Sequence, residues 1–304
     1  MLTEPTAVLL TGASGYLGGS LLVYLLHKFD LESRNVKLFT LVRKSEQVRK
    51  VLEQGGKVIP LIGDVQDAEG MKKLIIDNLV SIVIETVDAR QFAVAKPCIE
   101  ALAVVKERLN VPVHFVHTSG AKMFSSHVGI DQSNFLNDDG DVYNTMAELD
   151  TRHPVMKQTW ALMHIDDQVA LYATVLDNIL LLKAPYGKNG FYFSENGNFS
   201  WRSLSLAIVN ALRKRNGLEN IHELPVATDE DLVAMANVLD CNVGMVPVSI
   251  AGNCLIRGNN ARKLGWVPQH GVEHLMSDVD KEVAFIVEED SVFSANLKTE
   301  LLLS

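Results

Sequence analysis

Ala7-Val-Leu-Leu-Thr11 runs directly into Gly12-Ala-Ser-Gly15-Tyr-Leu-Gly18-Gly19, and this stretch decides the fold. Residues typical of a buried strand precede three glycines at three-residue spacing, and an apolar, amphipathic run follows. Glycine permits the tight turn that must reverse the chain there, because it lacks a Cβ. The backbone can then approach a pyrophosphate, toward which the next helix directs its unpaired N–H groups. The stretch therefore predicts a dinucleotide site in preference to an ordinary glycine turn.

We expect this turn to supply seven residues to the site. They are Thr11, Gly12, Ser14, Gly15, Tyr16, Leu17 and Gly18. Because the pyrophosphate would contact mainly backbone N–H groups, the conformation of the turn matters more than its side chains.

Strand and helix patterns alternate through the first half of the chain. The apolar periodicity predicts strands over residues 7–11, 36–42, 58–62, 80–84 and 112–117, and helices over 18–29, 45–52, 67–78 and 90–109. Such repeats predict an α/β fold, a Rossmann-type doubly wound parallel sheet. Pro60 supports the strand order 3-2-1-4-5, because proline belongs at a sheet edge and the third strand is an edge in that order.

The second half predicts a smaller C-terminal α+β lobe. Its pattern indicates a strand over residues 190–194 and helices over 165–176, 200–215, 228–239 and 271–288, with Ser200 as an N-cap. We therefore divide the chain into a dinucleotide-binding domain, residues 1–160, and a substrate-side lobe, residues 161–304, packed on the first.

Composition excludes several classes of protein. A hydrophobic fraction of 47% and a charged fraction of 21% are those of an ordinary globular chain. The net charge of −9 opposes binding to nucleic acid or to an anionic membrane. Cys98, Cys241 and Cys254 are too few and too scattered for a disulfide framework or a zinc site, so we expect no metal. Without a basic leader or an apolar run of about 18 residues, we expect a cytoplasmic protein without a membrane span.

The residues after the second and third strands bear on the choice of cofactor. A cation after the second strand accepts the 2′-phosphate of NADP, whereas a carboxylate binds the ribose of NAD. Arg43 and Lys44 end this strand, so we expect NADP, with NAD as the alternative cofactor and a solvated basic turn as the structural alternative. Asp64 is placed to accept from the adenine amino group, with Val65 against the ring. Asp67 is predicted to cap the next helix.

The ordered set of motifs resembles the extended short-chain dehydrogenase/reductase family, in particular its fungal NAD-dependent epimerase/dehydratase-like members. The resemblance covers nearly the whole chain and rests on Gly12-x-x-Gly15-x-x-Gly18, Arg43, Gly63-Asp64 and residues 116–120, 164–167, 186–197 and 263–268. It implies a NAD(P)-binding oxidoreductase or epimerase/dehydratase that acts on a small hydroxyl- or carbonyl-bearing substrate. It also suggests a homodimer formed through the helices that flank the fourth and fifth strands.

The same resemblance assigns catalytic residues. In that family a serine or threonine after the fifth strand acts with a Tyr-x-x-x-Lys motif, whose tyrosine is the general acid/base and whose lysine lowers the tyrosine pKa. Ser119, or Thr118, matches the first position. Tyr143 matches the tyrosine in spacing, and it is either a substrate-facing phenol or a loop residue. Ala147 stands where the lysine is expected, and an unassisted tyrosine is a poor base. Other candidate proton carriers are His117, His153, Lys122 and Lys157.

The segment between Tyr143 and His164 is shorter than in that family, which places a sixth parallel strand and part of the substrate pocket there. A block is missing between about Gln158 and Trp160. Either the protein lacks part of its substrate site or the sequence lacks an exon, and the fifth strand loses its usual neighbour in both cases. Two alternatives to an active enzyme follow. One is a non-catalytic dinucleotide sensor resembling NmrA-like regulators, which Ala147 favours, and the other is a truncated inactive family member.

Overall fold

The computed structural model describes residues 4–87, 92–147, 159–216, 224 and 226–288. Contacts divide the chain into two compact units that interleave along the sequence, whereas the sequence predicted one division after residue 160. The first unit contains Met1–Ala121, Ile165–Pro185 and Ala261–Trp266, and the second contains Lys122–His164, Tyr186–Asn260 and Val267–Ser304. The difference arises because helix α6 (Ile165–Leu180) packs against α1 (Tyr16–His27) and so joins the first unit.

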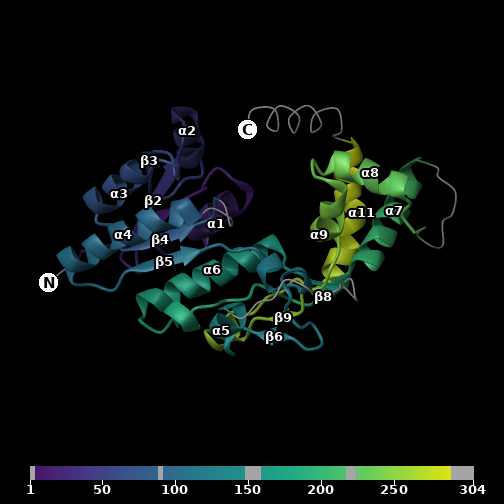
Figure 1. Ribbon diagram of the computed structural model, residues 1–304. Helices are drawn as coiled ribbons and strands as arrows, with labels where there is room; N and C mark the ends of the chain where they lie inside the picture. Colours follow the sequence, from purple (N-terminus) through teal and green to yellow (C-terminus); the bar gives the residue numbers. More distant parts are fainter. Residues whose placement is uncertain (1–3, 88–91, 148–158, 217–223, 225, 289–304) are drawn as a thin grey trace. The chain divides into compact units, whose positions relative to one another are not determined.

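The first unit is built on a five-stranded parallel sheet with the order β3-β2-β1-β4-β5 (Figure 1). This order confirms the predicted doubly wound α/β fold. The strands are β1 (Thr6–Leu10), β2 (Val36–Val42), β3 (Val58–Ile62), β4 (Ile82–Glu85) and β5 (His114–His117). Besides α1 and α6, the helices are α2 (Ser45–Glu53), α3 (Ala68–Asp77) and α4 (Phe92–Leu109). In the described part of the chain β5 pairs only with β4, which agrees with the reduced sixth-strand region.

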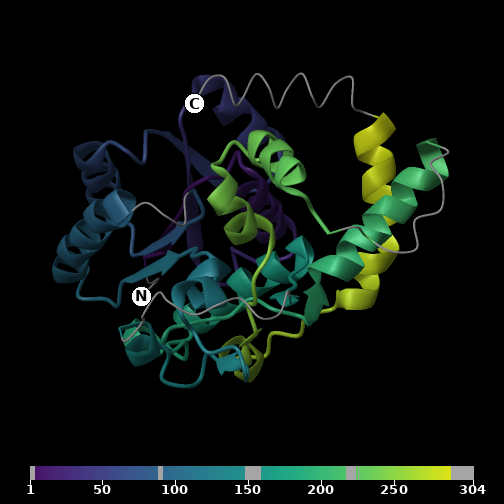
Figure 2. The same cartoon turned by 45° about the vertical axis from the view of Figure 1, so that its right-hand side comes forward.

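The core follows from the alternation of apolar side chains along the strands. In β1, Ala7 and Leu9 join a buried cluster with α3 and α4, which pack side by side (Figure 2). Val8 and Leu10 are equally buried and point to the opposite face, because successive side chains of a strand alternate. Burial on both faces is typical of a parallel sheet covered by helices. It fixes the register of the strands and therefore the positions of their carboxyl ends.

The position of Pro60 agrees with a strand at the edge of the sheet. The N–H of Gly63 donates to the carbonyl of Val42 at 3.0 Å, so alternate residues of β3 direct their backbone groups toward β2. Pro60, in register with Thr40, has the opposite parity. Its nitrogen therefore points away from β2, and the ladder between the two strands loses no hydrogen bond.

The second unit contains two short strand pairs and several helices, as predicted for an α+β lobe, but it is about as large as the first unit and not smaller. β6 (Leu136–Asn137) pairs in parallel with β9 (Ile256–Arg257), and β7 (Thr159–Ala161) pairs antiparallel with β8 (Asn198–Ser200). Helix α7 (Trp201–Asn216) packs against α11 (Val272–Glu288). Helices α5 (Val142–Ala147), α8 (Asp229–Val238) and α9 (Val246–Ile250) also belong to this unit, and α10 (Asn259–Lys263) begins in it and continues into the first unit.

The predicted strand over residues 190–194 is wrong. The buried carboxylate of Asp138 accepts hydrogen bonds from the backbone N–H groups of Phe193, Asn259 and Asn260 at 2.8, 2.7 and 2.9 Å. A backbone donor of the expected strand is therefore bound to a side chain, and the strand β8 forms later in the sequence. Burial raises the pKa of Asp138, while the three N–H donors oppose that effect.

Both predicted helix caps are confirmed. Asp67 accepts from the N–H of Gly70 at 3.0 Å at the start of α3. Ser200 accepts from the N–H of Ser203 at 3.0 Å at the start of α7. Side chains that bind these otherwise unpaired donors fix where the helices begin.

Among the described helices, none is by itself long and apolar enough to cross a membrane. The pair Asp229–Val238 and Val243–Ile250, bent by 86°, meets the criterion together by length and composition.

Candidate dinucleotide site

The glycine turn joins β1 to α1 through a backbone path that side chains would obstruct. Gly12 has a φ of +70°, and a Cβ there would lie 2.7 Å from Thr86 Oγ1. A Cβ at Gly18 would lie 2.2 Å from the carbonyl oxygen of Gly12 and 2.6 Å from Thr86 Oγ1. The first and third glycines therefore allow the start of α1 to pack closely on the ends of β1 and β4.

Gly15 occupies the tip of the turn and is the N-cap of α1. Its φ of −91° suits any residue, and a Cβ there would meet the carbonyl oxygen of Gly12 at 3.3 Å. Ser14, Gly15 and Tyr16 are exposed, Leu17 is half-buried, and the first turn of α1 carries no acidic side chain. Because the first N–H groups of a helix lack partners within it, this tip offers donors and a positive potential to an anion.

Two threonines join the carboxyl ends of β1 and β4. Thr86 Oγ1 donates to the carbonyl of Thr11 at 2.7 Å, and the N–H of Thr86 donates to Thr11 Oγ1 at 3.3 Å. Thr11 is fully buried, and its own N–H donates to the carbonyl of Ile84 at 3.0 Å. These bonds hold the point between β1 and β4 at which the strand order reverses, where doubly wound sheets bind their ligands.

Gln47 connects the basic turn after β2 to the glycine turn. Its Oε1 accepts from the backbone N–H groups of Arg43 and Lys44, both at 2.9 Å, and its Nε2 donates to Ser14 Oγ at 3.0 Å. The side chains of Arg43 and Lys44 are exposed. The structure thus brings the predicted cations next to the predicted pyrophosphate turn. Sequence reasoning missed Gln47, although glutamine at the third position of a helix often bonds back to the residues before it.

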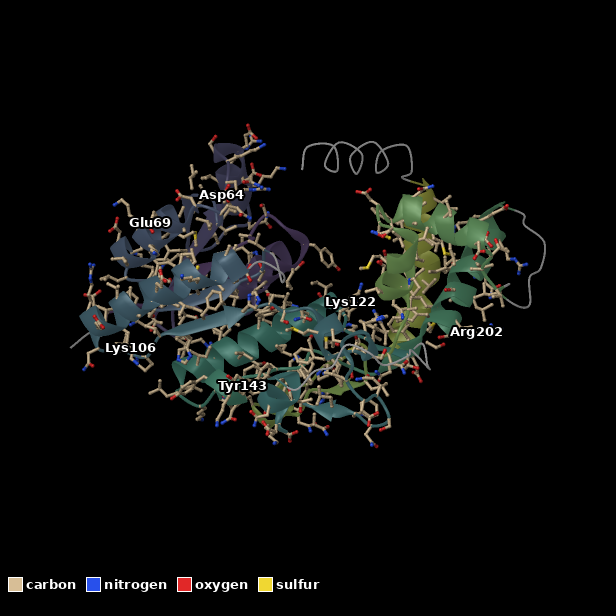
Figure 3. All side chains as sticks on the ribbon, viewed as in Figure 1. Asp64, Glu69, Lys106, Lys122, Tyr143 and Arg202 are labelled. Atoms are coloured by element: carbon tan, nitrogen blue, oxygen red, sulfur yellow. The ribbon has the colours of Figure 1, made fainter. Side chains whose placement is uncertain are left out.

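Asp64 and Val65 follow β3 at the same edge of the sheet, and Figure 3 labels Asp64 there. Asp64 is exposed, and its carboxylate accepts from the N–H of Gln66 at 2.9 Å. Val65 is buried in the core cluster, so its contact with an adenine ring stays a prediction. A cavity of about 240 Å³ lies beside Asp64, lined by Ile62, Gly63, Asp64, Asp67, Gly70, Lys73, Leu74, Asp77 and Asn78.

A buried carboxylate, also missed from the sequence, ends β4. Glu85 is 1% exposed, and its Oε1 accepts from the N–H of Val87 at 2.7 Å. Its Oε2 lies 2.7 Å from Nδ1 of His117, the residue in register with it on β5. The carboxylate therefore orients the imidazole, whose side chain is 33% exposed. Burial raises the pKa of the Cys98 thiol to about 11, and the negative charge of Glu85 makes a smaller contribution in the same direction.

The hydroxyl of Thr118 lies within hydrogen-bond distance of the buried hydroxyl of Tyr172. Its Oγ1 donates to the carbonyl of Glu85 at 2.6 Å and lies 2.6 Å from the hydroxyl of Tyr172 in α6. Burial raises the pKa of Tyr172 to about 12, so this phenol keeps its proton at neutral pH. Tyr172 is therefore a protonated hydrogen-bonding partner of Thr118. Ser119, the next residue after Thr118, is exposed.

The two predicted catalytic residues belong to different units. Ser119 lies in the first unit, and the exposed Tyr143, labelled in Figure 3, lies in α5 of the second. Their cooperation stays a prediction. Ala147 is the last residue of α5, and His153, Lys157 and Gln158 lie outside the described residues.

No family model and no curated protein sequence matches the chain. Many solved structures match its fold. The PbgP3 protein of Burkholderia pseudomallei is 13% identical with a TM-score of 0.56, over 90% of this chain and 95% of that one. L-threonine dehydrogenase of Clostridium difficile is 12% identical with a TM-score of 0.53, over 92% and 98%. dTDP-glucose 4,6-dehydratase of Bacillus anthracis in complex with NAD is 12% identical with a TM-score of 0.51, over 94% and 98%.

These likenesses extend over nearly the full length of each protein. The chain therefore has the extended short-chain dehydrogenase/reductase fold, as its motifs predicted.

Proposed function

We propose that the chain binds NAD(P) and acts as an oxidoreductase or epimerase/dehydratase on a small hydroxyl- or carbonyl-bearing substrate. The glycine turn carries this proposal, because its exposed tip joins the N-terminus of α1 and its first and third glycines admit no Cβ. The fold supports it as well, since a dehydrogenase and a dehydratase in complex with NAD share that fold.

The turn at the start of α1, Asp64, Ser119 and Tyr143 have distinct roles in this proposal. The N–H groups at the start of α1 would bind the pyrophosphate, and Asp64 would accept from the adenine amino group. When bound, the nicotinamide supplies or accepts the hydride. Ser119 would donate a hydrogen bond to the substrate oxygen, with Tyr143 as the second donor. The homodimer and the cytoplasmic location stay predictions.

We expect Gly15→Val to abolish dinucleotide binding while leaving the fold intact. The φ of Gly15 is open to valine and its position is exposed, but the added side chain would fill the space through which the pyrophosphate approaches. Titration of NADPH fluorescence measures the loss, which should exceed roughly 100-fold, the worth of two or more hydrogen bonds to a charged group.

The matched control is Gly244→Ala, since an added Cβ at Gly244 has nothing within 4 Å. It should bind NADPH like the parent protein. Equal binding by Gly15→Val and Gly244→Ala would exclude the turn as the cofactor site, and no binding of NADPH or NADH by the parent would overturn the proposed function.

We further propose that NADP is the preferred cofactor. Gln47 holds the backbone of Arg43 and Lys44 next to Ser14, and both side chains are exposed at the turn. A guanidinium binds a phosphate through paired hydrogen bonds, which favours Arg43 as the principal contact with the 2′-phosphate.

Arg43→Ala should weaken NADPH binding by roughly 10- to 100-fold, which corresponds to a charged hydrogen bond of about 1.5–3 kcal/mol. NADH binding should change by less than about twofold, because NADH lacks the 2′-phosphate. Parallel titrations with the two cofactors measure the ratio. Equal losses for both would contradict the assignment, and Arg49→Ala, on the exposed surface of α2, is the control for net charge.

A second candidate function is a non-catalytic dinucleotide sensor. Ala147 favours it, because no lysine stands at the position that lowers the tyrosine pKa in the family that the chain resembles. An NADPH oxidation assay with aldehydes, ketones and nucleotide sugars separates the candidates. Binding with turnover supports the enzyme, whereas binding without turnover of any of these substrates supports the sensor.

A further inference from the structure

Gln47 makes four hydrogen bonds that join two turns of the first unit. Its Oε1 accepts from the N–H groups of Arg43 and Lys44, both at 2.9 Å, and its own backbone N–H donates to the carbonyl of Lys44 at 3.0 Å. Its Nε2 donates to Ser14 Oγ, 33 residues earlier in the sequence, at 3.0 Å. One side chain therefore binds the turn after β2 to the glycine turn.

Helix α2 directs Gln47 toward the glycine turn. Gln47 and Val51 are one helical turn apart and so lie on the same face of α2. Val51 is buried and anchors that face, whereas Arg49 lies on the opposite face and is exposed. Gln47 itself is half-buried. The packed face of α2 and three side-chain hydrogen bonds together fix the direction of its amide group.

The bonds to Gln47 decide what the turn after β2 offers to an anion. The backbone N–H groups of Arg43 and Lys44 are both bound to Oε1, so they do not face an incoming ligand. The two side chains are exposed, and a guanidinium binds a phosphate through paired hydrogen bonds. An anion at this turn is therefore bound by side-chain cations, whose backbone positions Gln47 fixes.

Gln47 also determines the role of the Ser14 hydroxyl. A hydroxyl carries one hydrogen to donate and has lone pairs that accept. Because Nε2 of Gln47 donates to Ser14 Oγ, the hydroxyl keeps its own hydrogen for another acceptor. Ser14 is exposed in the glycine turn, the proposed pyrophosphate site. The bond from Gln47 thus prepares Ser14 to donate to a phosphate oxygen.

We propose that Gln47 is a positioning residue that sets the preference for NADP over NAD, an inference that rests on the proposed cofactor function. The pyrophosphate and the 2′-phosphate of NADP belong to one adenosine unit, so a site for both must hold its two turns at a limited separation. Gln47 fixes that separation before the cofactor binds, which reduces the entropy lost when Arg43 is ordered on the phosphate. NAD lacks the 2′-phosphate and gains nothing from this arrangement.

Parallel titrations of the full chain with NADPH and NADH test this role in Gln47→Leu, which removes both the acceptor and the donor of the side chain. We expect NADPH affinity to fall about 10-fold, the cost of ordering a long side chain that is no longer held in place. NADH affinity should fall by less than about threefold, since only the effect on Ser14 concerns it.

A double-variant cycle shows whether Gln47 acts through Arg43. Arg43→Ala should cost less NADPH affinity in Gln47→Leu than in the parent protein, by at least about threefold, because the guanidinium is no longer positioned there. A residue that only stabilised α2 would give equal costs in both backgrounds.

Gln54→Leu is the matched control, because Gln54 is the exposed C-cap of α2 and its amide donates to the carbonyl of Lys50 at 3.2 Å, within the same helix. It should bind both cofactors like the parent. Circular dichroism checks that each variant is folded, and Gln47→Met replaces Gln47→Leu if the leucine variant is not.

The parent titrations separate the two ways in which the inference can fail. A parent that binds neither NADPH nor NADH would overturn the proposed function and this inference together. A parent that binds a cofactor would overturn the inference alone if the ratio of NADPH to NADH affinity is the same in the Gln47 variant, or if Arg43→Ala costs as much in both backgrounds.

Discussion

Gly18→Ala should remove dinucleotide binding and destabilise the first unit at the same time. The new Cβ would lie 2.2 Å from the carbonyl oxygen and 2.5 Å from the carbonyl carbon of Gly12, and backbone atoms cannot move aside as the end of a flexible side chain can. Relief requires the start of α1 to shift away from β1 and β4. We expect a loss of about 1–3 kcal/mol of unfolding free energy, as for an overpacked core.

Urea unfolding and NADPH titration together measure this effect. The comparison with Gly15→Val separates two causes, because Gly15→Val should lose binding with a smaller loss of stability, since its Cβ would lie 3.3 Å from the carbonyl oxygen of Gly12, whereas Gly18→Ala should lose both. Gly244→Ala again serves as the control. Unchanged stability in Gly18→Ala would mean that α1 does not approach the turn as closely as described.

His117→Phe should destabilise the sheet. Phenylalanine keeps a planar ring over Phe115, on which His117 now stacks with ring centres 5.9 Å apart. It leaves the carboxylate of Glu85 buried without its imidazole partner. Leaving a buried polar group without one of its hydrogen-bond partners costs about 1–3 kcal/mol. We expect about 2 kcal/mol here, because the N–H of Val87 still binds the side chain of Glu85.

A second variant distinguishes the loss of the imidazole partner from simple repacking. Glu85→Gln combined with His117→Phe replaces the carboxyl group by a neutral amide and keeps an acceptor for the N–H of Val87. It should regain more than half of the unfolding free energy that His117→Phe loses, measured by urea unfolding at neutral pH. A double variant no more stable than His117→Phe would show that the imidazole acts only through packing.

The features predicted correctly from the sequence are those that local signals determine. Three glycines after an apolar strand, a proline in an edge strand and an aspartate before a helix each act within a few residues, through backbone geometry or a single cap. The sheet order then followed from chain connectivity. These signals were sufficient to locate the turn and both ends of most elements.

The missed features all depend on residues that only the folded chain brings together. The pairing of Glu85 with His117 requires the register of β4 on β5, and the bond from Gln47 to Ser14 requires α2 to approach the glycine turn. The strand predicted over residues 190–194 failed for the same reason, since Asp138, distant in sequence, binds the backbone of Phe193.

Pro60 also limits how copies of this chain can associate through their sheets. A sheet that grows from molecule to molecule needs two receptive edges on each copy, one to join the copy before and one to receive the next. The outward-facing nitrogen of Pro60 carries no hydrogen, so the β3 edge offers an incomplete row of donors to an incoming strand. Pairing of another strand at the β3 edge is therefore less favourable than pairing at an edge with a complete row of donors.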